Sequence, residues 1–461
     1  MKPRGGREAA RRRTLPTHAE RYARGKALRA KVARSGHGGW EPPRGRRDPV
    51  ATLTESSVGR LRNLIPIRYG RMLQSPFTFY RGAAAIMAAD LVETPSTAIH
   101  VQACGDCHLL NFGGYGTPEG HLTFDINDFD ETLPAPWEWD VKRLAASFVI
   151  AAQSNRFSAR QARAAARAAV REYRTRMAEY ATMPALEVWH ASVSNVLDHT
   201  KDPVLRKRYQ RLIRRERQRN PTSEFARLAH TVRGGARITD DPPLVYHPEI
   251  ERHRGFWGQA KRVLTRYAAT LASDRRLLFD RYELCDLAIK VVGVGSVGTM
   301  CAIALFLAAD DDPLFLQIKE ARRSVLEPFA GKSEYRNHGA RVVAGQRLMQ
   351  AASDIFLGWT AGDGGRHFYV RQLHDLKISP VVEIMSPVNL VEYATACGWA
   401  LARAHARSGD PSLLAGYMGK GTAFDTAVAD FAVAYARQNK RDHAALVAAV
   451  RSGRIDARTN A

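Results

Sequence analysis

Residues 281–385 form a block of strand-like sequence in a chain that elsewhere carries helical patterns. Turn residues separate its main apolar runs, which are Leu287–Val292, Thr299–Leu307 and Leu314–Glu320. The turn Asp310-Asp311-Asp312-Pro313 predicts an antiparallel hairpin, and Asp363-Gly364-Gly365 predicts a second one. Strands collected in one segment between two helical segments predict an α+β fold.

The 461 residues are enough for two or three cores, or for one large two-lobed unit. Residues 48–280 are predicted to form a mainly helical lobe, and residues 281–385 a β-rich lobe. Residues 386–461 are predicted to be helical and to return to the first lobe. Residues 1–47 hold 15 lysines and arginines against three acidic residues. Their few apolar side chains predict a flexible basic arm that binds polyanions weakly.

The formal net charge of +23 suits nucleic acid, an anionic membrane or an anionic substrate. Most of the basic residues are arginines in an alanine-rich chain, and genomic base composition also produces that bias, so the charge alone assigns no function. No apolar stretch follows Arg11-Arg12-Arg13, and glycines interrupt the longest uncharged run, Val291–Ala309. With five cysteines and no disulfide framework, the protein is expected in the cytoplasm without a membrane partner.

A dense polar cluster begins at Cys104. An aspartate with an asparagine five residues later, here Asp106 and Asn111, is the arrangement of kinase catalytic loops. In such loops the aspartate accepts the proton of the substrate hydroxyl, and the asparagine holds Mg²⁺. Cys104-x-x-Cys107-His108 also matches the string that attaches c-type haem, and the cysteine pair suits half of a zinc site or a redox pair. Haem attachment needs export, and a zinc site needs two more ligands.

An acidic run follows this cluster, with Asp125, Asp128, Asp130 and Glu131. Two short strands joined by a turn over Gly113–Gly120 would bring Asp128 back beside Asn111. These two side chains are therefore the predicted metal ligands. So many carboxylates close together are costly without a cation, unless the run is simply a solvated turn.

Gly105-Asp106-x-His108-x-x-Asn111, followed by Asn127–Asp130, resembles the corresponding elements of aminoglycoside phosphotransferase and choline-kinase-like enzymes. Cys104 stands where those enzymes often have histidine. Over about residues 20–450 the chain also resembles the bacterial domain-of-unknown-function 2252 family. That second resemblance rests on Phe79–Gly82, Cys104–Gly113, Asn127–Glu131, Trp137–Asp140, Val291–Thr299 and Gln317–Ala321. The resemblances imply a fold and a reaction class without a defined substrate.

The run from Gly293 to Gly298 supplies the predicted nucleotide-binding residues Gly293, Gly295, Ser296 and Gly298. As a kinase glycine-rich loop it would join two antiparallel strands, and Lys319 on the third strand would hold the α- and β-phosphates. As a Rossmann turn it would open a helix, with Glu320 as the acid that binds the ribose. A purely structural glycine turn is the third interpretation.

Two roles stay open in the sequence. The carboxylate that holds Lys319 could be Glu327 or Glu334, with Gln346 as a substitute, although Glu327 fits better as a helix cap. Arg81 lies between apolar runs, and it either contacts phosphate or substrate as part of the catalytic machinery or pairs with one of the carboxylates.

These patterns together predict a protein-kinase-like two-lobed fold with circularly permuted lobe order, because Asp106 precedes Lys319. The predicted function is transfer of phosphate from ATP, with Mg²⁺, to a hydroxyl of a small molecule. Two alternatives are an NAD(P)-dependent oxidoreductase that uses the 293–298 glycines, and a catalytically inactive kinase-like binding module whose basic arm engages nucleic acid.

Overall fold

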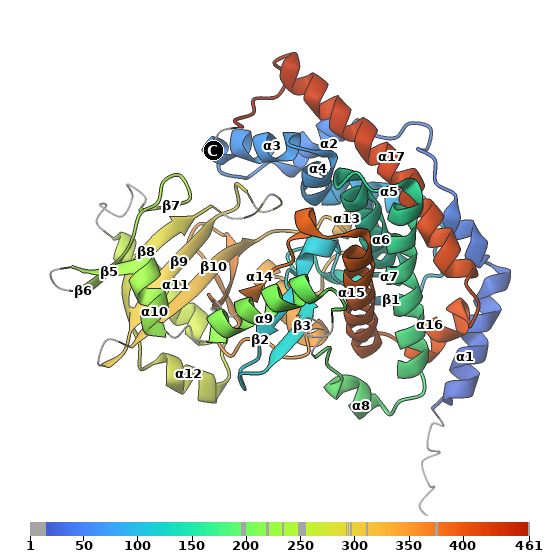
Figure 1. Cartoon of the computed structure of the whole chain (residues 1–461). Coiled ribbons are helices and arrows are strands. Elements are labelled where there is room, and N and C mark those ends of the chain that lie inside the picture. Colours follow the sequence, from blue (N-terminus) through green and yellow to red (C-terminus); the bar gives the residue numbers. More distant parts are fainter. Residues whose placement is uncertain are drawn as a thin grey trace, which may run out of the picture.

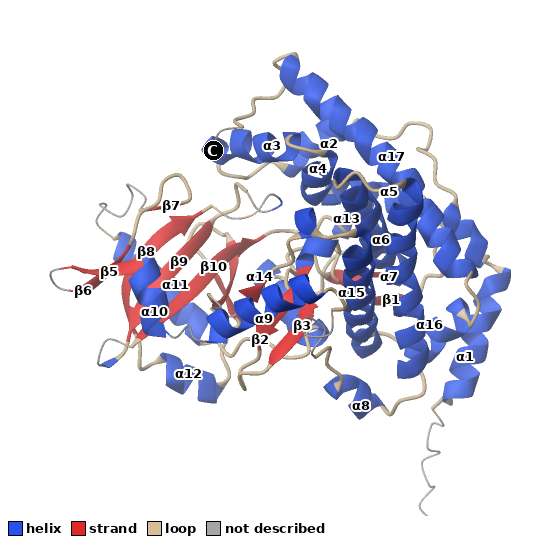
Figure 2. Ribbon diagram, viewed as in Figure 1, coloured by secondary structure: helices blue, strands red, loops and turns tan. Residues whose placement is uncertain are grey.

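The computed structural model describes residues 15–194, 200–217, 221–232, 235–247, 255–291, 293, 295, 297–309, 312–373 and 377–459, with only the backbone at 215–217 and 221–224. The six-stranded sheet and the long helices occupy different parts of the molecule, which confirms the α+β class (Figure 2).

The larger sheet has six antiparallel strands in the order β11-β12-β10-β9-β8-β7. Their bounds are β7 Val245–Tyr246, β8 Glu283–Lys290, β9 Cys301–Leu307, β10 Pro313–Ala321, β11 Gly358–Ala361 and β12 His367–Gln372. Both predicted hairpins are present, as β9–β10 and β11–β12. Aromatic side chains from α11 (Phe256–Ala268) and α12 (Ser273–Phe279) pack on this sheet through Tyr267 and Phe279.

The other part of the molecule is a helical body built around long helices that are far apart in the sequence (Figure 1). Its helices are α2 Pro49–Ser56, α3 Ile65–Leu73, α4 Pro76–Gly82, α5 Ala84–Val92, α6 Trp137–Ser154, α7 Ala159–Tyr180, α8 Ala185–His190, α15 Pro387–Ser408, α16 Pro411–Met418 and α17 Ala423–Arg451. Helix α6 is buried on almost every side, and its Trp137 stacks on Tyr173 of α7 with 5.7 Å between ring centroids. That apolar burial holds the body together.

The remaining strands are short and pair in smaller sheets. The three-stranded sheet is β13 (Lys377–Ile378), β2 (Phe112–Gly116) and β3 (Leu122–Ile126), and β1 (His100–Ala103) pairs with β4 (Leu133–Pro136). The remaining elements are α9 Pro203–Arg217, α10 Pro221–Leu228, β5 Ala229–Val232, β6 Gly235–Ile238, α13 Glu327–Ala330 and α14 His338–Met349. In Figure 1, β2 and β3 lie between the six-stranded sheet and α15.

The described part of the N-terminal segment, residues 15–47, is docked onto the body, which corrects the expectation of a flexible arm. Helix α1 (His18–Ala27) packs against α16 so closely that a Cβ at Gly25 would lie 2.0 Å from the carbonyl oxygen of Leu413. Arg46 forms ion pairs with Asp90 (2.6 Å) and Asp442 (2.7 Å). Composition could not predict this docking, because the partners of Arg46 lie 44 and 396 positions away in the sequence.

We expect Arg46→Ala to lower the free energy of unfolding by about 2–3 kcal/mol, because it strands two carboxylates that are each only 4% exposed. Arg47→Ala is the neighbouring control. Arg47 pairs with Glu55, and both side chains are at least 60% exposed, so that loss should be at most about 1 kcal/mol. Urea unfolding of the two variants measures the difference, and equal effects would mean that the docking contributes nothing.

Two other sequence features have clear outcomes. None of the helices in the described ranges combines the length and the apolar content that crossing a bilayer requires.

Phe79–Gly82, one of the strings on which the resemblance to the 2252 family rests, lies in helix α4. Ser75 caps this helix by accepting the backbone N–H of Thr78, and Pro76 occupies its first position.

Candidate functional site

The loop between β1 and β2 carries the polar cluster, and side chains of the buried helices α6 and α15 hold it in place. Asp140 of α6 accepts the backbone N–H groups of Cys104 (2.6 Å) and Gly105 (3.0 Å). His405 of α15 in turn contacts Asp140 at 3.2 Å. Gly105 has φ +84°, and a Cβ there would lie 2.5 Å from the carbonyl oxygen of Glu131, so this position requires glycine. The loop conformation is therefore determined by its anchors.

Asp106 is oriented by Arg143, which lies one turn beyond Asp140 on α6. Arg143 donates through Nε at 2.8 Å and through a second nitrogen to the same carboxylate oxygen, Oδ1. The other oxygen lies 4.0 Å from Nε2 of His108. Burial raises the pKa of Asp106, while the ion pair with Arg143 opposes that rise. The side chain is 20% exposed, so Asp106 presents an oriented and partly accessible carboxylate.

The β2–β3 hairpin brings Asn111 and the acidic run together as predicted. The backbone N–H of Asn127 donates to the carbonyl oxygen of Asn111 at 2.8 Å. The Asn111 side chain donates to the backbone carbonyl of Asp106 at 2.7 Å. Asp128 follows directly, and its Oδ1 accepts the N–H of Asp130 at 3.1 Å. The two predicted metal ligands thus lie just outside the paired strands, at the open end of this hairpin.

Lys319 of β10 contacts the acidic run, although 189 positions in the sequence separate it from Asp130. Its Nζ lies 3.0 Å from Asp130 and 4.0 Å from Asp128, well within the separation of roughly 10 Å at which one phosphate chain could contact both Lys319 and Asp128. Tyr369 of β12 donates its hydroxyl to Asp130 at 2.7 Å and places its ring under the ammonium. The nearest carboxylate to Lys319 is therefore Asp130. Its place in the acidic run was the only sequence signal for that role.

Lys319, Asp130 and Asp128 influence one another's pKa values. Burial alone would lower the pKa of Lys319, but the two carboxylates raise it well above its ordinary value. Burial would likewise raise the pKa of Asp130, but Lys319 and Tyr369 bring it below normal. Burial and the neighbouring Asp130 raise the pKa of Asp128. With its side chain 36% exposed, Asp128 is the more accessible carboxylate of the pair, since Asp130 is 24% exposed.

The glycine run connects β8 to β9, which are antiparallel neighbours. The expected turn therefore joins two strands, and no helix follows it, so it lacks the strand–turn–helix geometry of a Rossmann fingerprint. Gly295 lies close to the end of α4 and to Asp106, since a Cβ there would lie 3.3 Å from the carbonyl oxygen of Arg81 and 3.9 Å from the Asp106 carboxylate. Gly298 accepts the N–H of Leu61 at 2.7 Å. Ser296 lies outside the described residues.

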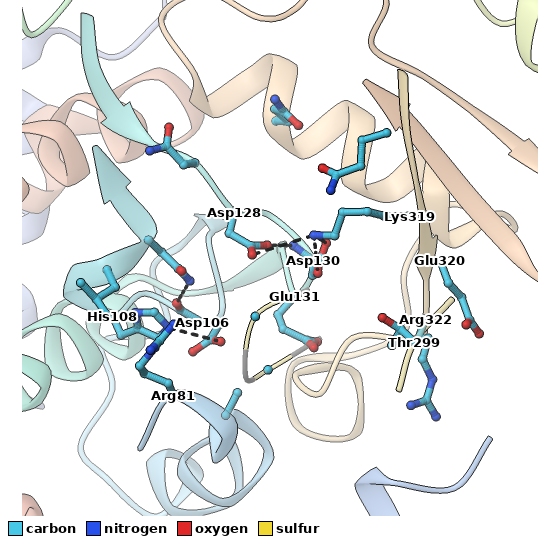
Figure 3. A pocket seen from close by; sticks show the side chains of 18 of the residues that line it. Arg81, Asp106, His108, Asp128, Asp130, Glu131, Thr299, Lys319, Glu320 and Arg322 are labelled. Atoms are coloured by element: carbon cyan, nitrogen blue, oxygen red, sulfur yellow. Dashed lines mark hydrogen bonds and ion pairs between the residues drawn. The ribbon is translucent and has the colours of Figure 1, made fainter. Parts of the chain in front are cut away.

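A cavity of about 720 Å³ collects these groups (Figure 3). The predicted residues that line it are Arg81, Asp106, Asn111, Asp128, Gly293, Gly295 and Lys319. Glu131 also lines it, and burial raises the pKa of this glutamate to about 7. Arg371 of β12 lines it too and donates to Gln317 at 3.0 Å and to the carbonyl oxygen of Asn127 at 3.3 Å. Sequence reasoning missed Arg143, Tyr369 and Arg371, because each acts through a contact between distant elements.

The structure shows where the candidates for the carboxylate beside Lys319 lie, and what surrounds Arg81. Glu327 pairs with Arg323 at 3.0 Å, and Glu334 is exposed, so neither is the carboxylate beside Lys319. Gln346 donates to Gln350 at 2.8 Å. Arg81, at the end of α4, has a buried Nε without a hydrogen-bond partner, and it is Arg143 that pairs with Asp106.

The two cysteines of the loop are core residues. Cys104 is 1% exposed and Cys107 is fully buried. A hydrogen bond with Cys107 acts to lower the pKa of Cys104, but burial together with the charges of Asp140, Asp106 and Asp128 raises that pKa to about 11. Thiols held neutral in this way are poor metal ligands and poor nucleophiles. Across the described ranges, no group of three histidine, cysteine or acidic side chains has the arrangement of a metal site.

One protein-family model matches residues 60–449, and the family carries the description "uncharacterized protein conserved in bacteria (DUF2252)". Comparisons with curated proteins and with solved structures found no match. The matched range includes the polar cluster around Asp106, the acidic run, the glycine run and the six-stranded sheet. The chain therefore belongs to the bacterial DUF2252 family.

Proposed function

We propose that this protein transfers a phosphoryl group from ATP, with Mg²⁺, to a hydroxyl group of a small molecule. The observation that carries the proposal is the contact of Lys319 with Asp130 and Asp128, inside a cavity that the glycine run and Asp106 also line. Phosphoryl transfer needs a cation for the phosphates, carboxylate or amide oxygens for Mg²⁺, and a base for the acceptor. The cavity holds one candidate for each task.

The roles follow from position and charge. Lys319 binds the phosphates, and Asn111 and Asp128 bind Mg²⁺, which neutralises charge on the transferring group. Two protein oxygens are a suitable set, because Mg²⁺ usually takes its remaining ligands from phosphates and water. Asp106 accepts the proton of the acceptor hydroxyl, and Arg143 keeps its carboxylate aimed at the cavity. The 293–298 glycine run covers the phosphates.

The proposal includes a kinase-like, two-lobed arrangement with permuted lobe order. The sheet with the glycine run and Lys319 serves as the nucleotide lobe, and the helical body with Asp106 serves as the catalytic lobe. An oxidoreductase that uses the same glycines is less well supported, because β9 and not a helix follows them. An inactive binding module differs from the proposal only in turnover and nucleotide binding.

We expect ATP with Mg²⁺ to raise the melting temperature of the wild-type protein, and ATP with EDTA or NAD(H) to leave it unchanged. Lys319→Met should abolish that shift, because it removes the phosphate-binding cation. The matched control is Lys332→Met at an exposed position, which should keep the shift. A shift with NAD(H) would favour the oxidoreductase, and no shift with either nucleotide would favour the inactive module.

A further inference from the structure

Four arginines from the helical body and the end of the sheet line one wall of the cavity: Arg60, Arg68, Arg81 and Arg322, here called the arginine band. Two other basic side chains of this cavity have acidic partners. Lys319 pairs with Asp130, and Arg323 pairs with Glu327. No member of the band forms an ion pair within 4 Å with any carboxylate in the described part of the chain.

The hydrogen bonds of the band go to neutral acceptors instead. Arg60 and Arg322 both donate to the carbonyl oxygen of Ser56, at 3.2 and 3.3 Å. Arg68 is only 2% exposed and donates to the carbonyl oxygen of Gly82 at 3.0 Å. Carbonyl acceptors hold a guanidinium in place but leave its charge uncompensated.

Burial makes that uncompensated charge costly. Burial and the like charge of neighbouring arginines lower the pKa of Arg60 to about 9. Burial also lowers the pKa of Arg68 to about 10. Both values lie above neutrality, so both side chains remain cations at physiological pH. Arg68 is buried and the other three arginines are half-buried, and four neighbouring cations without an ion-paired carboxylate favour a bound anion.

Arg81 connects the band to the reacting groups. Figure 3 shows it beside Asp106 and His108, on the wall of the cavity. The Nε of Arg81 is buried without a hydrogen-bond partner, and so is the Nε of Arg68. Arg68 lies next to Arg81, because another of its nitrogens donates to the carbonyl oxygen of Gly82, the residue directly after Arg81. The Nε of Arg81 therefore remains an unused donor near the carboxylate that would receive the acceptor's proton.

We propose that the acceptor is itself an anion, a small molecule with a phosphate or carboxylate group as well as the reacting hydroxyl, and that the arginine band binds that group. This inference rests on the proposed phosphotransferase function. For the nucleotide phosphates the proposed partner is Lys319, which lies 3.0 Å from Asp130 and 4.0 Å from Asp128. Arg81 lies instead beside Asp106, the proposed base, which places this end of the band where the acceptor would bind. Arg60, at the other end, donates to the carbonyl oxygen of Val297 in the glycine run.

Calorimetric titration of the full-length protein tests the band. Inorganic phosphate and acetate are the two probes, at ionic strength matched with chloride, with and without saturating ADP·Mg²⁺. We expect at least one probe to bind when ADP·Mg²⁺ is present. Arg81→Gln and Arg322→Gln, on separate elements, should each weaken that binding at least about tenfold and leave ADP·Mg²⁺ affinity within about twofold. Arg336→Gln, at an exposed position, is the control and should bind as the wild type does.

The outcomes separate this inference from the function on which it rests. Tighter binding of phosphate than of acetate would indicate a phosphorylated acceptor, and the reverse a carboxylate. Binding of neither probe, or binding that both variants retain, would overturn the role of the band. A probe that ADP·Mg²⁺ displaces would assign the band to the nucleotide and overturn it as well. If ADP·Mg²⁺ itself does not bind, the phosphotransferase proposal fails, while the titration without nucleotide still tests the anion site.

Discussion

Replacing Asp106 with asparagine should reduce phosphoryl transfer by about 10²- to 10⁴-fold, the usual contribution of a positioned general base. The amide keeps the size of the side chain and an oxygen that can accept from Arg143, but it cannot take a proton at neutral pH. Nucleotide affinity should change little, because the base acts mainly in the transition state. Formation of ADP from ATP, with water or an identified acceptor, measures the rate, and calorimetry measures the affinity.

The control for this variant must separate chemistry from folding, since Arg143 is only 2% exposed and loses a charged partner. Thermal unfolding of Asp106→Asn shows how much stability that costs. Asp280→Asn, at a side chain that is 57% exposed, should keep both activity and stability. An Asp106→Asn protein that is folded and fully active would exclude Asp106 as the base.

Asp125→Ala should lower the free energy of unfolding by about 3–5 kcal/mol, the largest stability effect expected in this chain. Asp125 and Arg403 form an ion pair at 2.7 Å in which both side chains have no exposure to solvent. Asp125 also accepts the N–H of Ala351 at 2.8 Å. Its removal leaves a buried guanidinium unpaired at the end of β3, directly before the turn that carries Asp128. Urea unfolding measures the loss.

A surface pair on another helix supplies the comparison. Asp430 and Arg163 lie 2.7 Å apart, with side chains 48% and 37% exposed, so Asp430→Ala should cost at most about 1 kcal/mol. The double variant Asp125→Leu/Arg403→Met should recover part of the loss, because no unpaired charge remains in the core. If Asp125→Ala were no more destabilising than Asp430→Ala, the buried pair would not support the fold as described.

Local patterns were sufficient wherever the interacting groups are close in sequence. The strand block and its two hairpins could be predicted because turn chemistry depends on a few consecutive residues. Asp106 and Asn111 belong to one loop, and Asp128 follows through a single short hairpin. The order of strands around the glycine run also placed Lys319 on the third strand, beside the acidic turn.

Sequence patterns failed where a role depends on which surfaces meet. The basic composition of residues 1–47 predicted an arm, yet Arg46 meets Asp442, 396 residues away, at 2.8 Å. Likewise, a run of four acidic residues does not show which carboxylate a lysine will reach. The turn after β3 directs both Asp128 and Asp130 inward, and Tyr369 of β12 completes the contact with Asp130.

The sequence by itself therefore determined the α+β class, the hairpins, and the residue types that gather around the cavity, because periodicity, turns and short loops are local. The tertiary structure alone decided the pairing of Arg143 with Asp106, the choice of Asp130 beside Lys319, and the absence of carboxylate partners for the arginine band in the described chain. Charge pairing depends on distances of a few ångströms between elements far apart in sequence, and its strength depends on burial. Only the packed chain determines both of those quantities.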